Sequence, residues 1–226
     1  LPAPSLNNSL VKILLEQCPL VAYLAHPKLG KRPIVVPDAE DDDAEDEGRP
    51  TKRDAFSLGS VAHREILGRG SDFQIVDAPD WRGKDARSQR ASAEAEGKVA
   101  ILAKHYAPVP HLKAAVQRAL TQEFNLPGLD EYETEVVATA QNQFGDYERI
   151  MVDMLSWAPP EKFGGPKIRI DYKTCQRIDD DSVFKAMQKY SYDLQDEFYK
   201  QVLDKNDCPT TGYVLFQQIS YPYMCR

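Results

Sequence analysis

The sequence lacks any apolar run near the ~20 residues that a membrane-spanning helix needs, which excludes a membrane span. It also lacks the short motifs of metal and nucleotide sites. There is no His-Glu-x-x-His and no Cys-x-x-Cys, and Gly68-Arg69-Gly70 has no third glycine. Basic residues are in the minority, with 28 Lys and Arg against 35 Asp and Glu and a net charge of −7. Because phosphate contacts need a basic face, this balance argues against nucleic acid as a partner.

What remains is an ordinary globular composition over 226 residues, 42% hydrophobic and 28% charged. The chain begins at Leu1 without a methionine, which favours a secretory leader already removed. Its four cysteines, without zinc-type spacing, predict disulfides and leave three pairings open. They are Cys18, Cys175, Cys208 and Cys225. We therefore expect a secreted, extracellular protein stabilised by disulfides.

An acidic stretch and two dibasic pairs divide the chain near residue 53. Eight of the ten residues in 38–47 are acidic, and such a block repels itself and predicts a disordered linker over 26–53. The flanking pairs are Lys31-Arg32, which proline follows, and Lys52-Arg53. We expect a processing protease to cut after Lys52-Arg53, separating a prosegment (1–53) from a main domain (54–226). The apolar side chains of 9–24 predict that this part of the prosegment docks on the main domain. They are Leu10, Ile13, Leu14, Leu20, Val21 and Leu24.

In this layout the chain resembles the proproteins of secreted fungal effectors and toxins that kexin cuts after a Lys-Arg pair. The resemblance covers the first 53 residues and rests on Thr51-Lys52-Arg53 after the acidic stretch. It implies a secreted main domain that acts on a host or competitor target. A disordered interdomain linker with incidental basic pairs is the alternative. We recognise no family in residues 54–226.

The hydrophobic periodicity predicts an α+β fold. We expect helices over 5–17, 54–68, 85–106, 111–125 and 182–204. We expect strands over 133–141, 147–157, 167–173 and 212–221, the first two joined by a hairpin turn. The strands predict an antiparallel sheet, a hairpin plus two strands, packed by helices. In 167–173 the alternation predicts that Ile168, Ile170 and Tyr172 face the core and that Lys167, Arg169, Asp171 and Lys173 face water.

Candidate chemistry is sparse, and we assign no catalytic residue, metal or cofactor from the sequence. His105 and His111 flank a proline-rich corner, where they would form an acid/base pair if they met. His63 has Glu65 close by, but two residues along a helix point the acid elsewhere. The acidic run at 179–181 suits a helix start better than a cation site.

Tyrosine is concentrated late, and seven of the eleven lie after residue 171. Tyrosine combines apolar area with a hydrogen-bonding tip, which recognition surfaces use. We expect Tyr192 and Tyr199, which fall off the predicted buried stripe, and Tyr221 and Tyr223, near the C-terminus, to contact a protein partner. The leading hypothesis is a secreted effector-like or toxin-like binding protein. The alternatives are a small secreted hydrolase or nuclease-like enzyme using His105 or His111, and an intracellular interaction protein with an acidic linker.

Overall fold

The computed structural model describes residues 5–16, 22–23, 26, 52–157 and 165–226. The helices are α1 (Asn8–Glu16), α3 (Lys52–Leu67), α4 (Lys84–Ala95), α5 (Ala103–Tyr106), α6 (Val109–Arg118), α7 (Asp180–Tyr190) and α8 (Tyr192–Asp204). A π-helical turn (Ala119–Glu123) continues α6, and a 3₁₀ turn (Leu129–Glu131) precedes the sheet. The strands are β1 (Ser5–Leu6), β2 (Phe73–Val76), β3 (Val99–Leu102), β4 (Tyr132–Gln141), β5 (Tyr147–Ser156), β6 (Lys167–Cys175) and β7 (Thr210–Gln218).

The main sheet is mixed rather than antiparallel. Strands β4, β5 and β6 form an antiparallel meander, but β7 lies parallel to β6 over nine residues because α7 and α8 carry the chain back across the sheet. Strand β1 adds a short parallel pairing to β5, and β2 pairs with β3 in a separate parallel ribbon. The prediction of helices packed on a sheet is confirmed, whereas the prediction of an antiparallel sheet fails because the helical crossover before β7 imposes parallel pairing.

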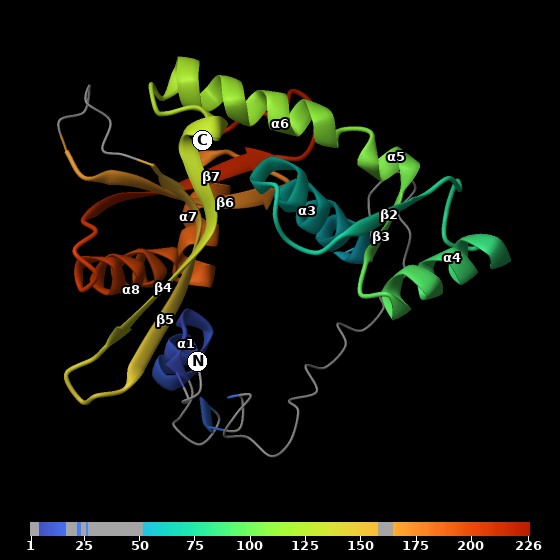
Figure 1. Ribbon diagram of the computed structural model, residues 1–226. Coiled ribbons are helices and arrows are strands. Elements are labelled where there is room, and N and C mark those ends of the chain that lie inside the picture. The colour runs from blue at the N-terminus through green and yellow to red at the C-terminus, as the bar shows by residue number, and fades with distance from the viewer. Residues whose placement is uncertain (1–4, 17–21, 24–25, 27–51, 158–164) are drawn as a thin grey trace.

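Helices cover both faces of the main sheet (Figure 1). On one face, α3 and α6 pack with Met154, Ile170, Tyr172 and Leu215 in a common core. On the other, α8 packs through Phe198, Tyr199 and Val202 onto β5. Since β6 lies between the two layers, both of its faces are buried, unlike a strand with one solvated face.

This double coverage confirms one half of the prediction for 167–173 and overturns the other. Ile168, Ile170 and Tyr172 are in the core, as expected. Arg169 and Asp171 were expected to face water, yet they are only 2% and 6% exposed. The reason is that α8 lies over the face that carries them, and the alternation alone does not reveal what lies above it.

The predicted helix 85–106 is also wrong in its second half. Helix α4 ends before Gly97, which adopts a left-handed φ of 72° that glycine accommodates without steric cost. The next residues are apolar and form β3, which pairs with β2 through four residues. The predicted helix 182–204 is two helices, because Ser191 adopts a left-handed φ of 48° between α7 and α8.

The described cysteines give no support to disulfide stabilisation. Cys175, Cys208 and Cys225 are all free thiols, and Cys18 lies outside the described residues. Burial raises the pKa of Cys175 to about 11 and that of Cys225 to about 12, so both sulfurs are protonated near neutral pH.

The acidic stretch at 38–47 also lies outside the described residues, and Lys52-Arg53 opens α3. Cleavage after this pair stays a prediction. Among the described helices, none has the length and apolar character needed to cross a bilayer.

Candidate active site

Three acidic residues form a row across the centre of the sheet. The register of the hairpin, in which Thr134 pairs with Met154 and Val136 with Val152, sets Glu135 opposite Asp153. The pairing of β5 with β6 ends at Met154 and Ile170, next to Asp153 and Asp171, and Lys173 Nζ lies 4.0 Å from Asp153 Oδ2 and 2.8 Å from Asp171 Oδ2. Strands β4, β5 and β6 thus each contribute one carboxylate to the same place. Like charges side by side on neighbouring strands destabilise a sheet, so such a row needs counter-charges or a chemical reason.

Asp153 is held from two sides. Its Oδ2 accepts a hydrogen bond of 2.9 Å from the main-chain N–H of Tyr172, and its Oδ1 lies 3.5 Å from Nε2 of His63 on α3. Burial by itself would raise the pKa of Asp153. The hydrogen bond with His63, the charges of Lys173 and His63 and the Tyr172 N–H outweigh burial and lower this pKa. The ionised form of Asp153 is therefore favoured.

Asp171 has the opposite character. Burial, opposed by the charge of Lys173 and reinforced by ionised Asp153, raises the pKa of Asp171 to about 6. Its Oδ1 accepts hydrogen bonds from Nζ of Lys173 at 2.9 Å and from Nε2 of Gln195 at 3.0 Å. Its Oδ2 lies 2.8 Å from the same ammonium group but has no well-directed hydrogen bond of its own. This buried carboxylate oxygen thus depends on the ion pair with Lys173 and has no well-directed hydrogen bond.

Lys173 and His63 form the solvent side of this cluster. Their side chains are 27% and 28% exposed, while Asp153 and Asp171 lie beneath them. Lys173 Nζ lies 4.0 Å from Oδ2 of Asp153 and 5.5 Å from the centroid of the Tyr192 ring on α8. The site is therefore a set of buried carboxylates reached from solvent past a lysine and a histidine.

Glu135 marks the edge of the cluster and has unusual backbone geometry. It adopts a φ of 50° in the middle of β4, a left-handed conformation that is unfavourable for a residue with a side chain. Its Oε1 lies 3.9 Å from Nδ1 of His63. His63 thus contacts both strands of the hairpin, since one ring nitrogen faces Glu135 on β4 and the other faces Asp153 on β5.

The residues suit a hard divalent cation, although the described part of the chain holds no preformed cage of three or more acidic, histidine or cysteine ligands. Carboxylate oxygens are the ligands that Mg²⁺ takes, and Mg²⁺ usually keeps several waters and binds through one or two carboxylates plus substrate phosphates. Asp153 and Asp171 supply two such carboxylates, one with a buried oxygen that lacks a hydrogen bond. The donor set therefore fits Mg²⁺ or Mn²⁺ that binds together with a substrate.

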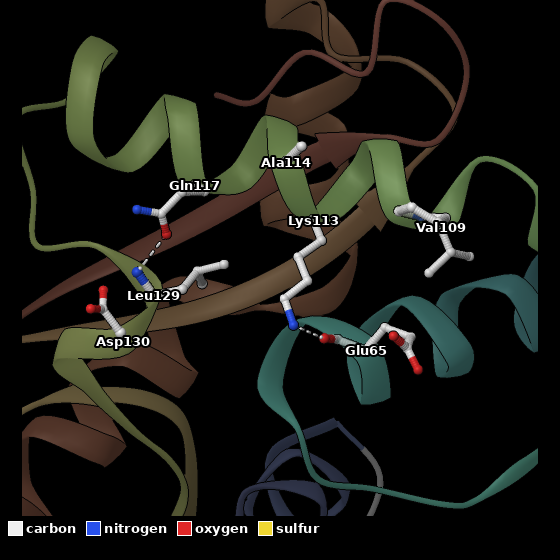
Figure 2. Close-up of a pocket in the computed structure, with 8 residues that line it drawn as sticks. Glu65, Val109, Lys113, Ala114, Gln117, Leu129 and Asp130 are labelled. Carbon is white, nitrogen blue, oxygen red and sulfur yellow. Dashed lines mark hydrogen bonds between the residues drawn. The ribbon is translucent and has the colours of Figure 1, made fainter.

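A separate hollow of about 610 Å³ lies between α3 and α6 (Figure 2). Its polar groups tie the structure together, since Lys113 Nζ donates to the Glu65 main-chain oxygen and Gln117 Oε1 accepts from the Leu129 N–H. Its lining includes none of the residues of the carboxylate cluster. We therefore place the chemistry at the cluster and not at this hollow.

The residues singled out from the sequence lie elsewhere. His111 is exposed and stacks on Tyr223 with ring centroids 5.8 Å apart. His105 follows β3 in the short helix α5. Neither histidine belongs to the carboxylate cluster. Asp179 caps α7 by accepting from the Ser182 N–H.

The four tyrosines proposed to contact a partner are in different environments. Tyr199 is only 9% exposed, so the reason for choosing it was wrong, because α8 turns that side chain onto the sheet. Tyr192 is half-buried beside Lys173, Tyr223 is half-buried, and Tyr221 is 84% exposed. Partner binding through these residues stays a prediction.

Sequence reasoning missed the whole cluster, yet two signals were available. The predicted hairpin turn already implies the register that pairs Glu135 with Asp153. The spacing of Asp171 and Lys173 puts both on one face of a strand, a pattern assigned to water only because the cover provided by α8 was unknown. His63 had no local signal, because its acidic partners are 72 and 90 residues away in the sequence.

Comparison with known proteins assigns no family to the chain. No family model matches the chain, and no curated protein matches it. Among solved structures, the chain is similar to a crystal structure from Eubacterium rectale described as a "Putative exonuclease", with 13% sequence identity and a TM-score of 0.47. The match covers 80% of this chain and 59% of that protein. At this level the likeness carries no argument about activity.

Proposed function

We propose that the protein is a metal-dependent phosphodiesterase that cleaves nucleic acid. The observation that carries the proposal is the buried pair Asp153 and Asp171 on neighbouring strands with the ammonium group of Lys173 between their oxygens, 2.8 Å from one and 4.0 Å from the other. Two carboxylates for a divalent cation and one fixed cation beside them match the requirements of phosphoryl chemistry, which needs positive charge around the phosphorus.

The geometry favours this chemistry over other uses of paired carboxylates. Asp153 and Asp171 are within hydrogen-bonding reach of each other. Glycosidases need the two carboxyl groups about 5 Å apart or more. The ammonium group of Lys173 lies directly against the oxygens of the pair, which places a fixed positive charge where a phosphate would bind.

The residues of the site have distinct roles in the proposed reaction. A Mg²⁺ ion bound by Asp153 and Asp171 would polarise the phosphate and lower the pKa of a bound water. Lys173 supplies positive charge to the phosphoryl oxygens and holds a proton at Nζ. His63 keeps Asp153 ionised, and Gln195 orients Asp171 through its amide group. In the overall hydrolysis the water oxygen bonds to phosphorus as the bond to the departing sugar oxygen breaks, and that oxygen gains a proton.

The acidic net charge does not oppose a nucleic-acid substrate as strongly as it first suggests. Eight of the 35 acidic side chains lie in 38–47, and the rest of the chain carries 28 basic and 27 acidic ones. A nearly neutral body whose active site presents Lys173 is compatible with a phosphate chain, since binding depends on local and not on net charge. The proposed substrate departs from the expectation drawn from composition, and the cleavage test decides between the two.

The test measures cleavage of labelled single-stranded and double-stranded DNA and RNA by the full chain with Mg²⁺, Mn²⁺ or EDTA. We expect cleavage with either metal, none with EDTA, and at least a ~100-fold loss in Lys173→Ala and Asp153→Asn, because each change removes charge stabilisation at the phosphate. Matched controls are Lys200→Ala and Asp204→Asn, which remove a lysine and an aspartate from a surface ion pair on α8.

A second readout is independent of turnover. Mg²⁺ should stabilise the wild-type fold in a thermal-shift assay by mass action, and this gain should vanish in Asp153→Asn but not in Asp204→Asn. If the metal stabilises all variants equally, or if Lys173→Ala cleaves as well as the wild type, the cluster is not an active site.

A further inference from the structure

The N-terminal residues 5–16 lie against the proposed active site. Strand β4 pairs along one edge of β5 from Tyr132 to Gln141, so β1 must pair on the other edge, which β6 also uses. Strand β6 pairs with β5 only near Met154 and Leu155, and β1 takes up the edge further along, at Tyr147 and Glu148. The N-terminal segment thus fills the edge that β6 leaves free beyond the carboxylates. Figure 1 shows α1, in dark blue, beside this part of the hairpin.

Helix α1 contacts the residues that position the cluster. The side-chain amide of Asn8 donates to Oε1 of Gln195 at 3.2 Å, and the amide of Gln195 in turn donates to Asp171. Lys12 Nζ lies 5.8 Å from the centroid of the Tyr192 ring, and Lys173 Nζ lies 5.5 Å from the same centroid. Lys12 also donates to the main-chain oxygen of Tyr190. The helix therefore places a second ammonium group at the ring beside Lys173.

The apolar side of α1 is buried, as the sequence predicted for the prosegment. Leu10 is 4% exposed, and Val11 packs against the cluster that contains Val152 and Tyr199. Leu15, on the other side of the helix, is 68% exposed. His26 Nε2 lies 3.0 Å from the Ser5 main-chain oxygen and so holds β1 in turn. These contacts define a specific docked position.

The docking is nevertheless incomplete. Strand β1 is two residues long, and Asn8 Oδ1 is buried without a hydrogen-bond partner. A buried acceptor left unpaired weakens the docked state relative to the hydrated, released one. Weak docking of this kind is expected of a segment that exchanges with another occupant, because elements that move belong to the less stable part of a structure.

We propose that residues 5–16 are an autoinhibitory segment that covers the side of the cluster formed by Tyr192 and Gln195 and that leaves when a nucleic-acid backbone binds there. The inference depends on the proposed nuclease function. Lys12 and Lys173 lie beside the same Tyr192 ring, so a phosphate chain that approaches Lys173 from the side of Tyr192 meets α1. Release of α1 also frees Gln195, which holds Asp171, from its hydrogen bond with Asn8.

The test uses the full chain with Leu10→Asp, which puts a charge under α1, and Leu15→Asp as the matched control on the exposed side of the same helix. We expect Leu10→Asp to raise kcat/KM for DNA by tenfold or more with Mg²⁺ and to tighten DNA binding, measured by fluorescence anisotropy with Ca²⁺ in place of Mg²⁺. Leu15→Asp should match the wild type. Hydrogen exchange at the main-chain amides of residues 5–6 and 147–148 reports whether β1 has left β5, and the other amides of β5 that pair with β4 serve as the internal reference.

The outcomes separate the two proposals. If neither the wild type nor Leu10→Asp shows metal-dependent cleavage although exchange confirms release, the nuclease function fails. If Leu10→Asp is released and cleaves DNA no faster than the wild type, the nuclease function stands and autoinhibition fails. Should Leu10→Asp not fold, the milder double change Asn8→Ala and Lys12→Ala decides, because it removes the polar contacts to Gln195 and Tyr190 and leaves Leu10 buried. An unchanged kcat/KM in this variant overturns the inference.

Discussion

Replacing Asp171 with asparagine should stabilise the fold while it abolishes activity. Burial and the neighbouring charge of Asp153 raise the pKa of Asp171 from 3.8 to about 6, so its ionised form is disfavoured in the folded protein. A shift of about two units corresponds to roughly 3 kcal/mol of folding free energy at neutral pH. Asparagine resembles the protonated carboxyl group in shape and still accepts the hydrogen bond from Gln195. The variant should therefore gain up to about 3 kcal/mol at pH 7–8.

The pH dependence gives the sharpest form of this prediction. A pKa that folding raises contributes stability that is fully present below the unfolded value and is lost as pH rises through the folded value. The wild type should thus equal Asp171→Asn near pH 3.5 and fall behind it between about pH 4 and pH 6, with a constant gap above pH 7. Urea unfolding followed by fluorescence, at several pH values in EDTA, measures this difference directly.

The matched control is Asp77→Asn, which neutralises an exposed aspartate in the turn after β2. Its unfolding free energy should stay within about 0.5 kcal/mol of the wild type at every pH. If Asp171→Asn is less stable than the wild type at pH 8, then Asp171 stabilises the fold through its ion pair with Lys173. That result would refute the conclusion that its ionised form is disfavoured in the folded protein. A stability gain with loss of activity is the trade-off expected of an active-site residue.

Three further predictions follow from the same contacts. Mg²⁺ affinity, measured by calorimetry, should be constant above about pH 6 and fall about tenfold per unit below it, because Asp171 must lose its proton to bind metal; an affinity that does not change down to pH 5 contradicts its role as a ligand. His63→Gln should lower kcat/KM about 10–100-fold with little change in stability, since His63 positions Asp153 and Glu135 from the solvent side; a variant as active as the wild type excludes that role. Gly212→Ala should destabilise the fold by about 1–3 kcal/mol in urea unfolding, because the new Cβ would lie against the Asp196 carboxylate and 2.5 Å from Arg169 Nη2. Gly83→Ala serves as the control, since a Cβ at Gly83 has room. Equal effects of the two changes would argue against a tight ion pair at Gly212.

The sequence predicted the parts of this fold that depend on local pattern. The hairpin at 142–146 was found because Asn142 and Gly145 are turn-forming residues between two apolar strands, and the structure has the strands at 132–141 and 147–156. The helix over 54–68 and the strand over 167–173 were found from their periodicity, and both are confirmed within a few residues. In each case the signal lies in residues that are close in the sequence.

The parts that failed depend on contacts between distant segments. Strand β3 is four residues long and is stabilised by pairing with β2. Residues 99–102 follow a helix-favouring segment, and no pattern within them indicates this pairing. The direction of β7 depends on how α7 and α8 cross the sheet. The candidate site was not predicted for the same reason, since Glu135, Asp153 and Asp171 come together only when three strands pair. The loop between β5 and β6 has no turn signal that fixes its length, so the sequence does not set the register of these two strands.

The two buried polar groups on β6 show how a structural charge differs from a functional one. Arg169 and Asp171 lie two residues apart on the same face, and α8 covers both. Arg169 Nη2 donates to the side chain and the main chain of Asp196, at 2.8 and 3.2 Å, and Nε donates to Thr210, so its buried charge is well compensated. Asp171 keeps one oxygen without a hydrogen bond and a pKa near 6 although a lysine lies within 2.8 Å. The buried charge of Asp171 is therefore the less well compensated of the two, which is what the proposed metal site requires.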